Sequence, residues 1–309
     1  MIKPPIITHE IRSEIETIEK NPALYEEKNF DDRMEAISYI EFNVIDRIDG
    51  LLQTISPPEG LTYLKQYAEK VKRRLENVDD NLFQRLRADI RRGDCKGTAL
   101  KELIDEYVGR YSSDSRRQDE VGYDSLDMFI NGLLLAEALP VETKSREPEM
   151  LYYQQTPARI IFELVEKAHL GEGDVFYDLG SGLGQVQILV NLLSGAAAKG
   201  IEFEPAYCNY ASACAADLNL SRVEFFNADA RTMDYSEGTV FFMYTPFDGG
   251  ILQEVLEKLR GESQTRSIRV FTYGPCTRQV SQQNWLKCAD PNGVHVNALG
   301  VFSSLGPHS

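Results

Sequence analysis

The chain has 309 residues, of which 42% are hydrophobic, so it can form a packed core in about two domains and is not a disordered chain. Its formal net charge of −15 argues against binding to nucleic-acid backbones, which requires a basic surface. No apolar run approaches the roughly 18 residues of a membrane span, and residues 1–7 lack the apolar core of a signal peptide. Neither nucleic acid nor a membrane is therefore an expected partner.

Cysteine and histidine usage predicts the compartment and the absence of a metal site. The five cysteines include no C-x-x-C pair, and the four histidines include no pair at metal-ligand spacing. We therefore expect a reduced, cytoplasmic protein without disulfides and without a bound metal.

Residues 8 to about 140 are predicted to be mostly helical. Apolar residues recur at spacings of three and four over 37–55, 61–75, 82–90 and 100–107, and a further helix is expected over 124–138. The charged, proline-bounded segment 143–148 is the predicted linker. These patterns predict a helical N-terminal domain over 1–145 and a second domain over 146–309.

Basic residues gather in one part of the helical half. Two interpretations are open: a local basic face, or a solvated helix surface paired with the acidic helices nearby, which we favour. The residues concerned are Lys72, Arg73, Arg74, Arg85, Arg87, Arg91 and Arg92.

From about residue 150 strands alternate with helices. An apolar run ends at Asp178, an amphipathic helix is expected over 158–167, and further strands are predicted over 197–203, 223–227, 239–244 and 268–273. Two late strands, over 285–288 and 294–303, flank the turn residues 290–293 and predict an antiparallel hairpin. The pattern predicts a mostly parallel α/β sheet that finishes with a reversed strand.

Three glycines at alternate positions follow the strand that ends at Asp178. Gly180, Gly182 and Gly184 precede an amphipathic segment, which indicates a tight turn and a helix N-terminus suited to a nucleotide-like cofactor. In the dinucleotide fingerprint the third glycine comes three positions after the second, where this chain has Gln185. The spacing therefore disfavours a nicotinamide cofactor.

The pattern D-x-G-x-G-x-G from Asp178 resembles motif I of the class I S-adenosylmethionine-dependent methyltransferases. The resemblance implies a Rossmann-like, seven-stranded sheet and S-adenosyl-L-methionine as cofactor. Glu202 stands at a strand tip, 22 residues after Gly180, where a carboxylate can accept hydrogen bonds from both ribose hydroxyls. Asp229, after Ala228 at the next strand end, resembles the family residue that accepts from the adenine amino group.

A narrower resemblance extends the set of cofactor residues. The run D-L-G-S-G-x-G-Q-V, preceded by Tyr-Tyr-Gln-Gln-Thr-Pro over 152–157, is similar to the non-SET histone lysine methyltransferases of the disruptor-of-telomeric-silencing type. In that family a segment ahead of motif I closes over the methionine end of the cofactor. The residues implied to bind the cofactor are Gln154, Thr156, Asp178, Gly180, Ser181, Gly182, Gly184, Gln185, Glu202, Ala228 and Asp229.

The acceptor side is predicted at the end of the fourth strand. Residues 243–247 resemble the Asn-Pro-Pro-Phe motif of amine methyltransferases, but Tyr244 stands where that motif has Asp or Asn. Without that amide, nucleobase methylation is in doubt. Tyr244 and Phe247 are the candidate catalytic residues, and with Phe241 and Tyr273 they are expected to form an apolar pocket that lowers the pKa of an amine. No general base is identified.

Three functions stay open at this point. The first is a methyltransferase acting on a protein amine such as lysine, because an acidic enzyme suits a basic protein. The second is a methyltransferase acting on a small amine. The third is a non-catalytic cofactor-binding module or a nicotinamide enzyme. The sequence leaves the acceptor and the oligomeric state open.

Overall fold

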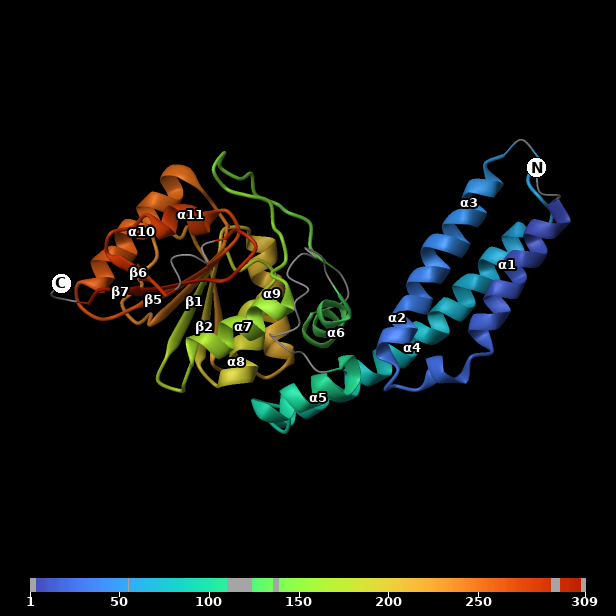
Figure 1. Cartoon of the computed structure of the whole chain (residues 1–309), viewed down its shortest axis with the longest axis horizontal. Helices are drawn as coiled ribbons and strands as arrows, with labels where there is room; N and C mark the ends of the chain where they lie inside the picture. The colour runs from blue at the N-terminus through green and yellow to red at the C-terminus, as the bar shows by residue number, and fades with distance from the viewer. Residues whose placement is uncertain (1–3, 55, 110–123, 136–138, 290–294, 307–309) are drawn as a thin grey trace. The chain divides into compact units, whose positions relative to one another are not determined.

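The computed structural model describes residues 4–54, 56–109, 124–135, 139–289 and 295–306. The chain divides into two compact units, one over 1–86 with 103–110 and the other over 87–102 with 111–309 (Figure 1). Helix α6, Ser125–Leu134, belongs to the second unit, which therefore begins earlier in the chain than the boundary expected between 145 and 146.

The first unit is built from helices around one apolar core. Apolar residues of the predicted periodic runs, such as Ile40, Leu64 and Leu75, are 0–2% exposed. The two apolar runs over 61–90 belong to one long helix, and the run over 37–55 is interrupted by a π-helical segment. The elements are α1 Pro4–Glu19, η1 Pro22–Tyr25, α2 Phe30–Tyr39, η2 Ile40–Ile45, α3 Asp46–Leu52, α4 Leu61–Arg92 and α5 Thr98–Val108. Residues 87–92 of α4 and 98–102 of α5 belong to the second unit.

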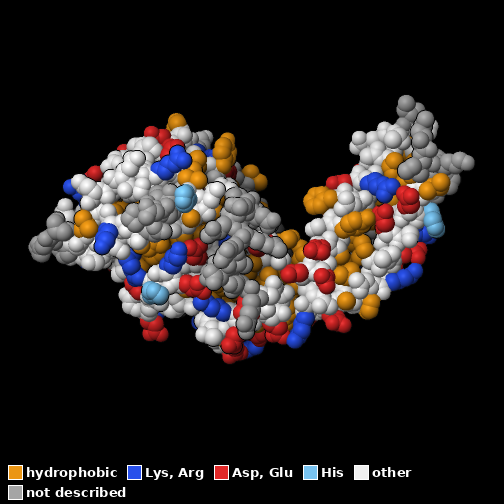
Figure 2. Space-filling view, viewed as in Figure 1, with side chains coloured by type: hydrophobic (Ala, Val, Ile, Leu, Met, Phe, Trp, Pro, Cys, Tyr) orange, Lys and Arg blue, Asp and Glu red, His pale blue; other side chains and the backbone are white. Residues whose placement is uncertain are grey.

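Basic side chains of α4 form ion pairs with acids of the neighbouring helices. Lys72 Nζ lies 2.5 Å from Glu41 Oε2, and Arg74 Nη1 lies 2.6 Å from Glu19 Oε1. Acids and bases are interspersed on the visible face of these helices (Figure 2). For these residues the structure confirms a paired helix surface rather than a separate basic face.

The second unit holds a seven-stranded sheet in the order β3-β2-β1-β4-β5-β7-β6. The first five strands run parallel, and β7 pairs antiparallel with both β5 and β6. This confirms the predicted mixed sheet, while the expected turn at 290–293 lies outside the described residues. The strands are β1 Val175–Leu179, β2 Ala197–Glu202, β3 Val223–Asn227, β4 Val240–Tyr244, β5 Arg269–Tyr273, β6 Leu286–Cys288 and β7 Gly300–Ser304.

Helices cover both faces of the sheet (Figure 1). One face carries α7 Ala158–Ala168, α8 Gln185–Ser194 and α9 Pro205–Asp217, and the other carries α10 Gly249–Ser263 and α11 Cys276–Ser281. Apolar residues of α10 and α11 share a core cluster with alternate residues of β1 and β4. The order of strands reverses between β1 and β4, and ligands of such sheets bind outside the carboxyl ends of the strands at that point.

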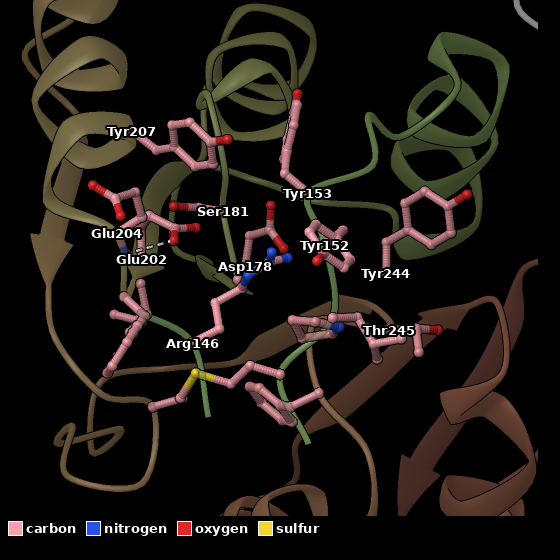
Figure 3. A pocket seen from close by; sticks show the side chains of 18 of the residues that line it. Arg146, Tyr152, Tyr153, Asp178, Ser181, Glu202, Glu204, Tyr207, Tyr244 and Thr245 are labelled. Carbon is pink, nitrogen blue, oxygen red and sulfur yellow. Dashed lines mark hydrogen bonds between the residues drawn. The ribbon is translucent and has the colours of Figure 1, made fainter. Parts of the chain in front are cut away.

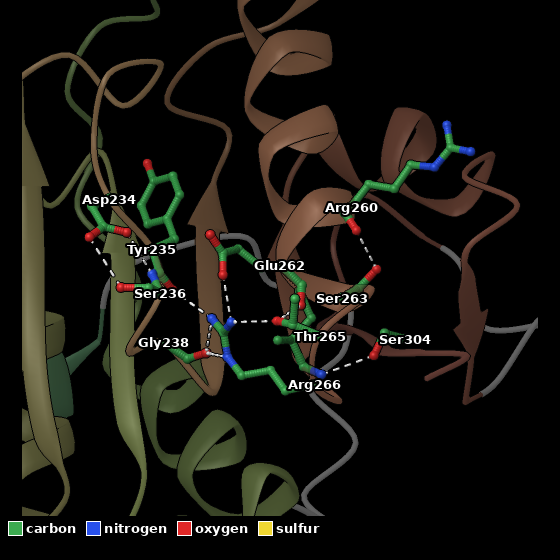
Figure 4. Close-up of polar contacts among 11 residues, drawn as sticks. Asp234, Tyr235, Ser236, Gly238, Arg260, Glu262, Ser263, Thr265, Arg266 and Ser304 are labelled. Carbon is green, nitrogen blue, oxygen red and sulfur yellow. Dashed lines mark hydrogen bonds and ion pairs between the residues drawn. The ribbon is translucent and has the colours of Figure 1, made fainter. Parts of the chain in front are cut away.

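An arginine network holds the opposite end of β4. Arg266 donates to the carbonyl oxygens of Tyr235 and Gly238, and its Nη1 pairs with Glu262 Oε2 at 2.5 Å (Figure 4). These bonds fix the loop before β4 on the last turn of α10. They stabilise the fold away from the carboxyl ends of the strands.

Among the described residues, no helix has both the length and the apolar character needed to cross a bilayer. None of the five cysteines is in a disulfide, and four of them are buried.

Candidate functional site

A cavity opens at the carboxyl ends of β1, β2, β3 and β4 (Figure 3). It encloses about 1010 Å³ including its opening, at the upper end of the range for small-molecule sites. Both candidate catalytic residues line it, and so do all the predicted cofactor residues except Gly182 and Gly184. The lining residues of that set are Gln154, Thr156, Asp178, Gly180, Ser181, Gln185, Glu202, Ala228, Asp229, Tyr244 and Phe247.

The glycine turn between β1 and α8 requires residues without side chains. Gly180 and Gly184 both have φ +84°, in the left-handed region that L-residues rarely adopt. A Cβ at Gly180 would lie 2.2 Å from Pro246 Cβ, and a Cβ at Gly184 would lie 2.6 Å from Ala211 Cβ. Gly180 thus permits close approach of the β4 loop, and Gly184 permits the packing of α8 on α9.

Hydrogen bonds from β2 hold the turn in place. The backbone N–H groups of Gly180 and Ser181 donate to the carbonyl of Ile201 at 2.9 and 3.0 Å. The N–H of Gly182 donates to Glu202 Oε2 at 2.7 Å. The role of Gly182 is therefore to support the Glu202 carboxylate from behind rather than to line the cavity.

The Glu202 carboxylate is 9% exposed and lines the cavity. Its second oxygen, Oε1, accepts from the N–H of Glu204 at 2.8 Å. Burial raises the pKa of Glu202, and these backbone hydrogen bonds work against that rise. Because a carboxylate offers about four lone-pair directions, Glu202 retains acceptor capacity for a diol in the cavity.

Asp178 lies deeper, at the end of β1. It is 3% exposed, and Gln187 Nε2 donates to its Oδ2 at 2.8 Å. Burial raises the pKa of Asp178 well above its usual value, and the negative charge of Glu202 adds to the rise. Burial and the neighbouring charge of Glu202 thus both disfavour the charged form of Asp178.

Asp229, at the end of β3, is half of an ion pair. Arg231 Nη2 lies 2.6 Å from Asp229 Oδ2 and 2.5 Å from Glu147 Oε1. The hydrogen bonds and charge of Arg231 lower the pKa of Asp229 despite its partial burial. Asp229 lines the cavity as an ionised acceptor, and Arg231 joins it to the segment before α7.

That segment, residues 142–156, is called the strap here. Thr143 Oγ1 donates to Glu204 Oε1 at 2.6 Å, the Lys144 N–H donates to Glu204 Oε2 at 2.8 Å, and Lys144 Nζ lies 3.3 Å from the centre of the Phe203 ring. Although burial favours the neutral acid, these hydrogen bonds lower the pKa of Glu204 to about 2. These contacts anchor the segment 143–148, which the sequence predicted as a linker, to the cavity rim.

The other half of the strap is joined to the loop after β4. The N–H of Leu151 donates to the carbonyl of Pro246 at 3.0 Å, and the N–H of Asp248 donates to the carbonyl of Glu149 at 3.0 Å. Met150 and Phe247 form an antiparallel bridge between these bonds. The strap and the β4 loop thus form one wall of the cavity.

Tyr244 is half-buried at the end of β4, with its ring centre 4.9 Å from that of Tyr273. The expected pocket is only partly found, because neither Phe241 nor Tyr273 is among the described residues that line the cavity. Phe241 has the opposite side-chain parity along β4, so it faces the α10 side and stacks on Tyr177 at 5.6 Å. Tyr273 stands beside Tyr244 in register and supports it instead.

Two buried polar atoms in the cavity wall suit a bound ligand. Ser181 Oγ and Gln185 Oε1 have no hydrogen-bond partner within the described part of the chain, although their residues are only 6% and 3% exposed. Buried polar atoms are normally paired, and each of these belongs to a residue that lines the cavity. The acceptors at Gln185, Glu202 and Asp229 fit the amino-acid, sugar and purine donors of S-adenosylmethionine.

Several lining residues were not predicted from the sequence. Arg146, with its guanidinium carbon 3.3 Å from the centre of the Tyr152 ring, and Tyr153 come from the strap. Tyr207 comes from α9, and its hydroxyl donates to Glu142 Oε1 at 3.1 Å. Only Glu204 carried a local signal, since it precedes Pro205 and caps α9 through the N–H of Ala206. Across the described ranges no group of three or more His, Cys, Asp or Glu side chains is placed to hold a metal ion.

Comparison with known proteins gives one family match. The model of the family described as "Histone methylation protein DOT1" matches residues 149–245, which include the second part of the strap, the glycine turn, Glu202 and Tyr244. No curated protein matches the chain.

Solved structures also resemble about half of the chain. An RNA methyltransferase from Salinibacter ruber in complex with S-adenosyl-L-homocysteine is 27% identical, covering 50% of this chain and 95% of that one, with a TM-score of 0.39. A putative RNA methyltransferase from Pyrococcus horikoshii is 16% identical, covering 53% of this chain and 91% of that one, with a TM-score of 0.39. Because these TM-scores are below 0.5, they decide neither the fold nor the activity.

The sheet order, the glycine turn with its acids, and the family match together identify an S-adenosylmethionine-dependent methyltransferase of class I. S-adenosyl-L-methionine is its methyl donor.

Proposed function

We propose that the enzyme methylates an amine on a protein side chain, of the lysine type. The observation that supports this proposal is the type of side chain at the acceptor end of the cavity. There Tyr244 stands at the tip of β4, and none of the lining residues 244–247 has a side-chain amide that would hold a nucleobase amino group. The family match over 149–245, to a family described by histone methylation, supports the same acceptor class.

The cavity mouth favours a polypeptide over a free metabolite. Two large strap side chains at the cavity are exposed, Tyr152 to 80% and Leu151 to 42%. Exposed apolar groups around a binding site are typical of a surface that meets another protein. The net charge of −15 adds long-range attraction for a lysine-rich partner.

The methyl donor and the protein contribute different parts of the reaction. When bound, S-adenosylmethionine supplies a methyl group already activated by its sulfonium. The chain must hold an unprotonated nitrogen in line with it and exclude water. The rings of Tyr244 and Phe247 form an apolar wall that disfavours an ammonium ion and so lowers the pKa of an entering amine. The bonds between the strap and the β4 loop close that wall.

The proposed role of each cofactor residue follows from its place in the cavity. Glu202 accepts from the ribose hydroxyls and Asp229 from the purine amino group. Gln154, Thr156, Ser181 and Gln185 hold the amino-acid end. A cytoplasmic location is part of the proposal, because none of the five cysteines is in a disulfide.

The test is transfer of a radiolabelled methyl group from S-adenosylmethionine. The acceptors are a lysine-rich protein, the same protein with its lysines acetylated, and a panel of small amines. We expect label in the unmodified protein, on lysine after hydrolysis, and none in the acetylated control. Label in small amines alone would replace the proposal with a small-molecule methyltransferase.

A pair of variants tests the acceptor wall. Tyr244→Ala is expected to lower the turnover number while leaving the dissociation constant of S-adenosylhomocysteine within about twofold, because Tyr244 contacts the acceptor rather than the cofactor. Tyr244→Phe keeps the ring and is the matched control. Equal loss of cofactor affinity in Tyr244→Ala would move Tyr244 out of the acceptor site.

A further inference from the structure

Helix α6, Ser125–Leu134, is fixed at both ends within the second unit. At its start, Asp124 Oδ1 accepts from the N–H groups of Leu126 and Asp127 at 3.0 and 3.2 Å. At its end, Arg87 donates to three carbonyl oxygens, those of Gly132, Leu133 and Leu135, at 2.7, 3.0 and 2.8 Å. Side chains thus bind backbone groups at both ends of the helix, which stabilises it.

One face of α6 points toward the methyltransferase fold. Asp127 is 2% exposed, and its Oδ1 accepts from the N–H of Ala158 at 2.7 Å, at the start of α7. Asn131 is four residues later, one helical turn along the same face. Asn131 therefore lies over the end of the strap and the start of α8.

Asn131 is the centre of a cluster of three amides. Its Nδ2 donates to Gln155 Oε1 at 3.1 Å, and Gln155 Nε2 donates back to Asn131 Oδ1 at 2.7 Å. Gln185 Nε2 donates to the same Asn131 Oδ1 at 2.8 Å. In this arrangement Asn131 Oδ1 accepts hydrogen bonds from both glutamine side chains.

This arrangement determines how Gln185 presents its amide to the cavity. Because Nε2 is engaged by Asn131, Oε1 is the atom of this cavity-lining side chain that is left to accept a hydrogen bond. Gln185 is 3% exposed, and its Oε1 has no partner within the described residues. A buried acceptor of this kind selects a hydrogen-bond donor, and the cationic amino group at the amino-acid end of the cofactor is such a donor.

We propose that Asn131 is a positioning residue that orients Gln185 to bind the amino group of the cofactor's amino-acid end. The sequence placed this residue in the predicted helical domain, outside the cofactor site. The inference rests on the proposed role of Gln185 in cofactor binding.

The test compares two ligands that differ at the amino-acid end. S-adenosylhomocysteine carries that end, whereas 5′-methylthioadenosine keeps only the adenosine and a methylthio group. Calorimetry on the full chain measures both dissociation constants in the wild type and in Asn131→Leu. We expect about a tenfold weaker affinity for S-adenosylhomocysteine, the effect of one hydrogen bond to a charged group. The affinity for 5′-methylthioadenosine is expected to stay within about twofold.

Two further variants separate positioning from a general effect on the fold. Asn131→Asp keeps the acceptor for Gln185 Nε2 and is expected to stay within about threefold of the wild-type affinity for S-adenosylhomocysteine. Met128→Ala alters the same helix at a side chain that is 43% exposed, and it is the control for α6 itself. It is expected to leave both affinities unchanged.

The outcomes distinguish the inference from the function on which it rests. If Gln185→Leu weakens S-adenosylhomocysteine selectively but Asn131→Leu does not, the positioning role is wrong and the role of Gln185 stands. If Gln185→Leu has no selective effect, the proposed cofactor role of Gln185 fails. Equal losses for both ligands in Asn131→Leu, or no rescue by Asn131→Asp, would also overturn the inference.

Discussion

The two walls of the cavity are held by different kinds of contact. On the strand side, backbone hydrogen bonds fix the turn at 180–184 to Ile201 and Glu202. On the strap side, many of the contacts are hydrogen bonds between side chains that are far apart in sequence, such as Thr143 with Glu204 and Arg231 with Glu147. The strand side is thus part of the fold itself, whereas the first half of the strap is attached to the cavity rim by side-chain contacts that can be removed singly.

This difference predicts that changes on the strand side have larger effects than changes in the strap. Backbone hydrogen bonds at strand ends cannot be replaced without moving the sheet, while a single strap contact contributes about 1 kcal/mol.

The largest effect is expected from Gly180→Ala. The new Cβ would meet Pro246 at 2.2 Å, and φ +84° is unfavourable for alanine by about 1–2 kcal/mol. With the added steric conflict, we expect methyl transfer to fall at least about hundredfold. The control is Gly261→Ala in α10, where no atom lies within 4 Å of the new Cβ. Activity of Gly180→Ala close to wild type would contradict the close approach of the β4 loop.

A second large effect concerns Asp127, which holds the start of α7 directly after the strap. Burial raises the pKa of Asp127 to about 6, above the ordinary value of 3.8. The folded state therefore binds the proton more tightly, and this contribution to stability is present below about pH 4 and lost as the pH rises through 6.

The variant Asp127→Asn has no titrating carboxyl group at this position, so its stability is compared with that of the wild type. The difference in unfolding free energy, wild type minus variant, is expected to fall by about 2 kcal/mol between pH 4 and pH 7, as denaturant titrations at each pH will show. Parallel pH curves for the two proteins would mean that Asp127 is not buried as the structure has it.

Glu202→Ala removes the acceptor proposed for the ribose. Cofactor affinity is expected to weaken by about 1–3 kcal/mol, because hydrogen bonds to a charged acceptor are lost. Calorimetry with S-adenosylhomocysteine measures the change, and Glu224→Ala, an exposed acid on β3, is the matched control. An unchanged dissociation constant would show that the ribose is not bound by Glu202.

The smallest effect is expected in the strap. Thr143→Val removes one hydrogen bond to Glu204 while keeping the shape of the side chain. We expect a loss of cofactor affinity of about 1 kcal/mol, roughly fivefold. A loss as large as that of Glu202→Ala would remove the distinction between the two walls.

The strand wall was the predictable part of the site. Glycine spacing and strand-end acids are local patterns, so Gly180, Glu202 and Asp229 were assigned to the cavity from sequence, and each of them lines it. The mixed sheet with its reversed strand was predicted for the same reason, since periodicity and turn residues act over short stretches.

The strap wall was predicted less well, because its contacts join residues distant in the chain. Nothing near Thr143 or Lys144 indicates Glu204 as their partner some 60 positions later. Charge and proline content suggested a linker at 143–148, which is what such a segment resembles before its contacts are known. Phe241 was expected in the pocket for a different reason. Alternate side chains of a strand point to opposite faces of the sheet, and the prediction did not take account of this alternation between Phe241 and Tyr244.

The most direct test of the central claim is a crystal structure of the full chain with S-adenosylhomocysteine. The account predicts both ribose hydroxyls within hydrogen-bond distance of the Glu202 carboxylate, with the amino-acid end against Gln185. A bound ligand from which the carboxylates of Glu202 and Asp229 are both turned away would contradict it.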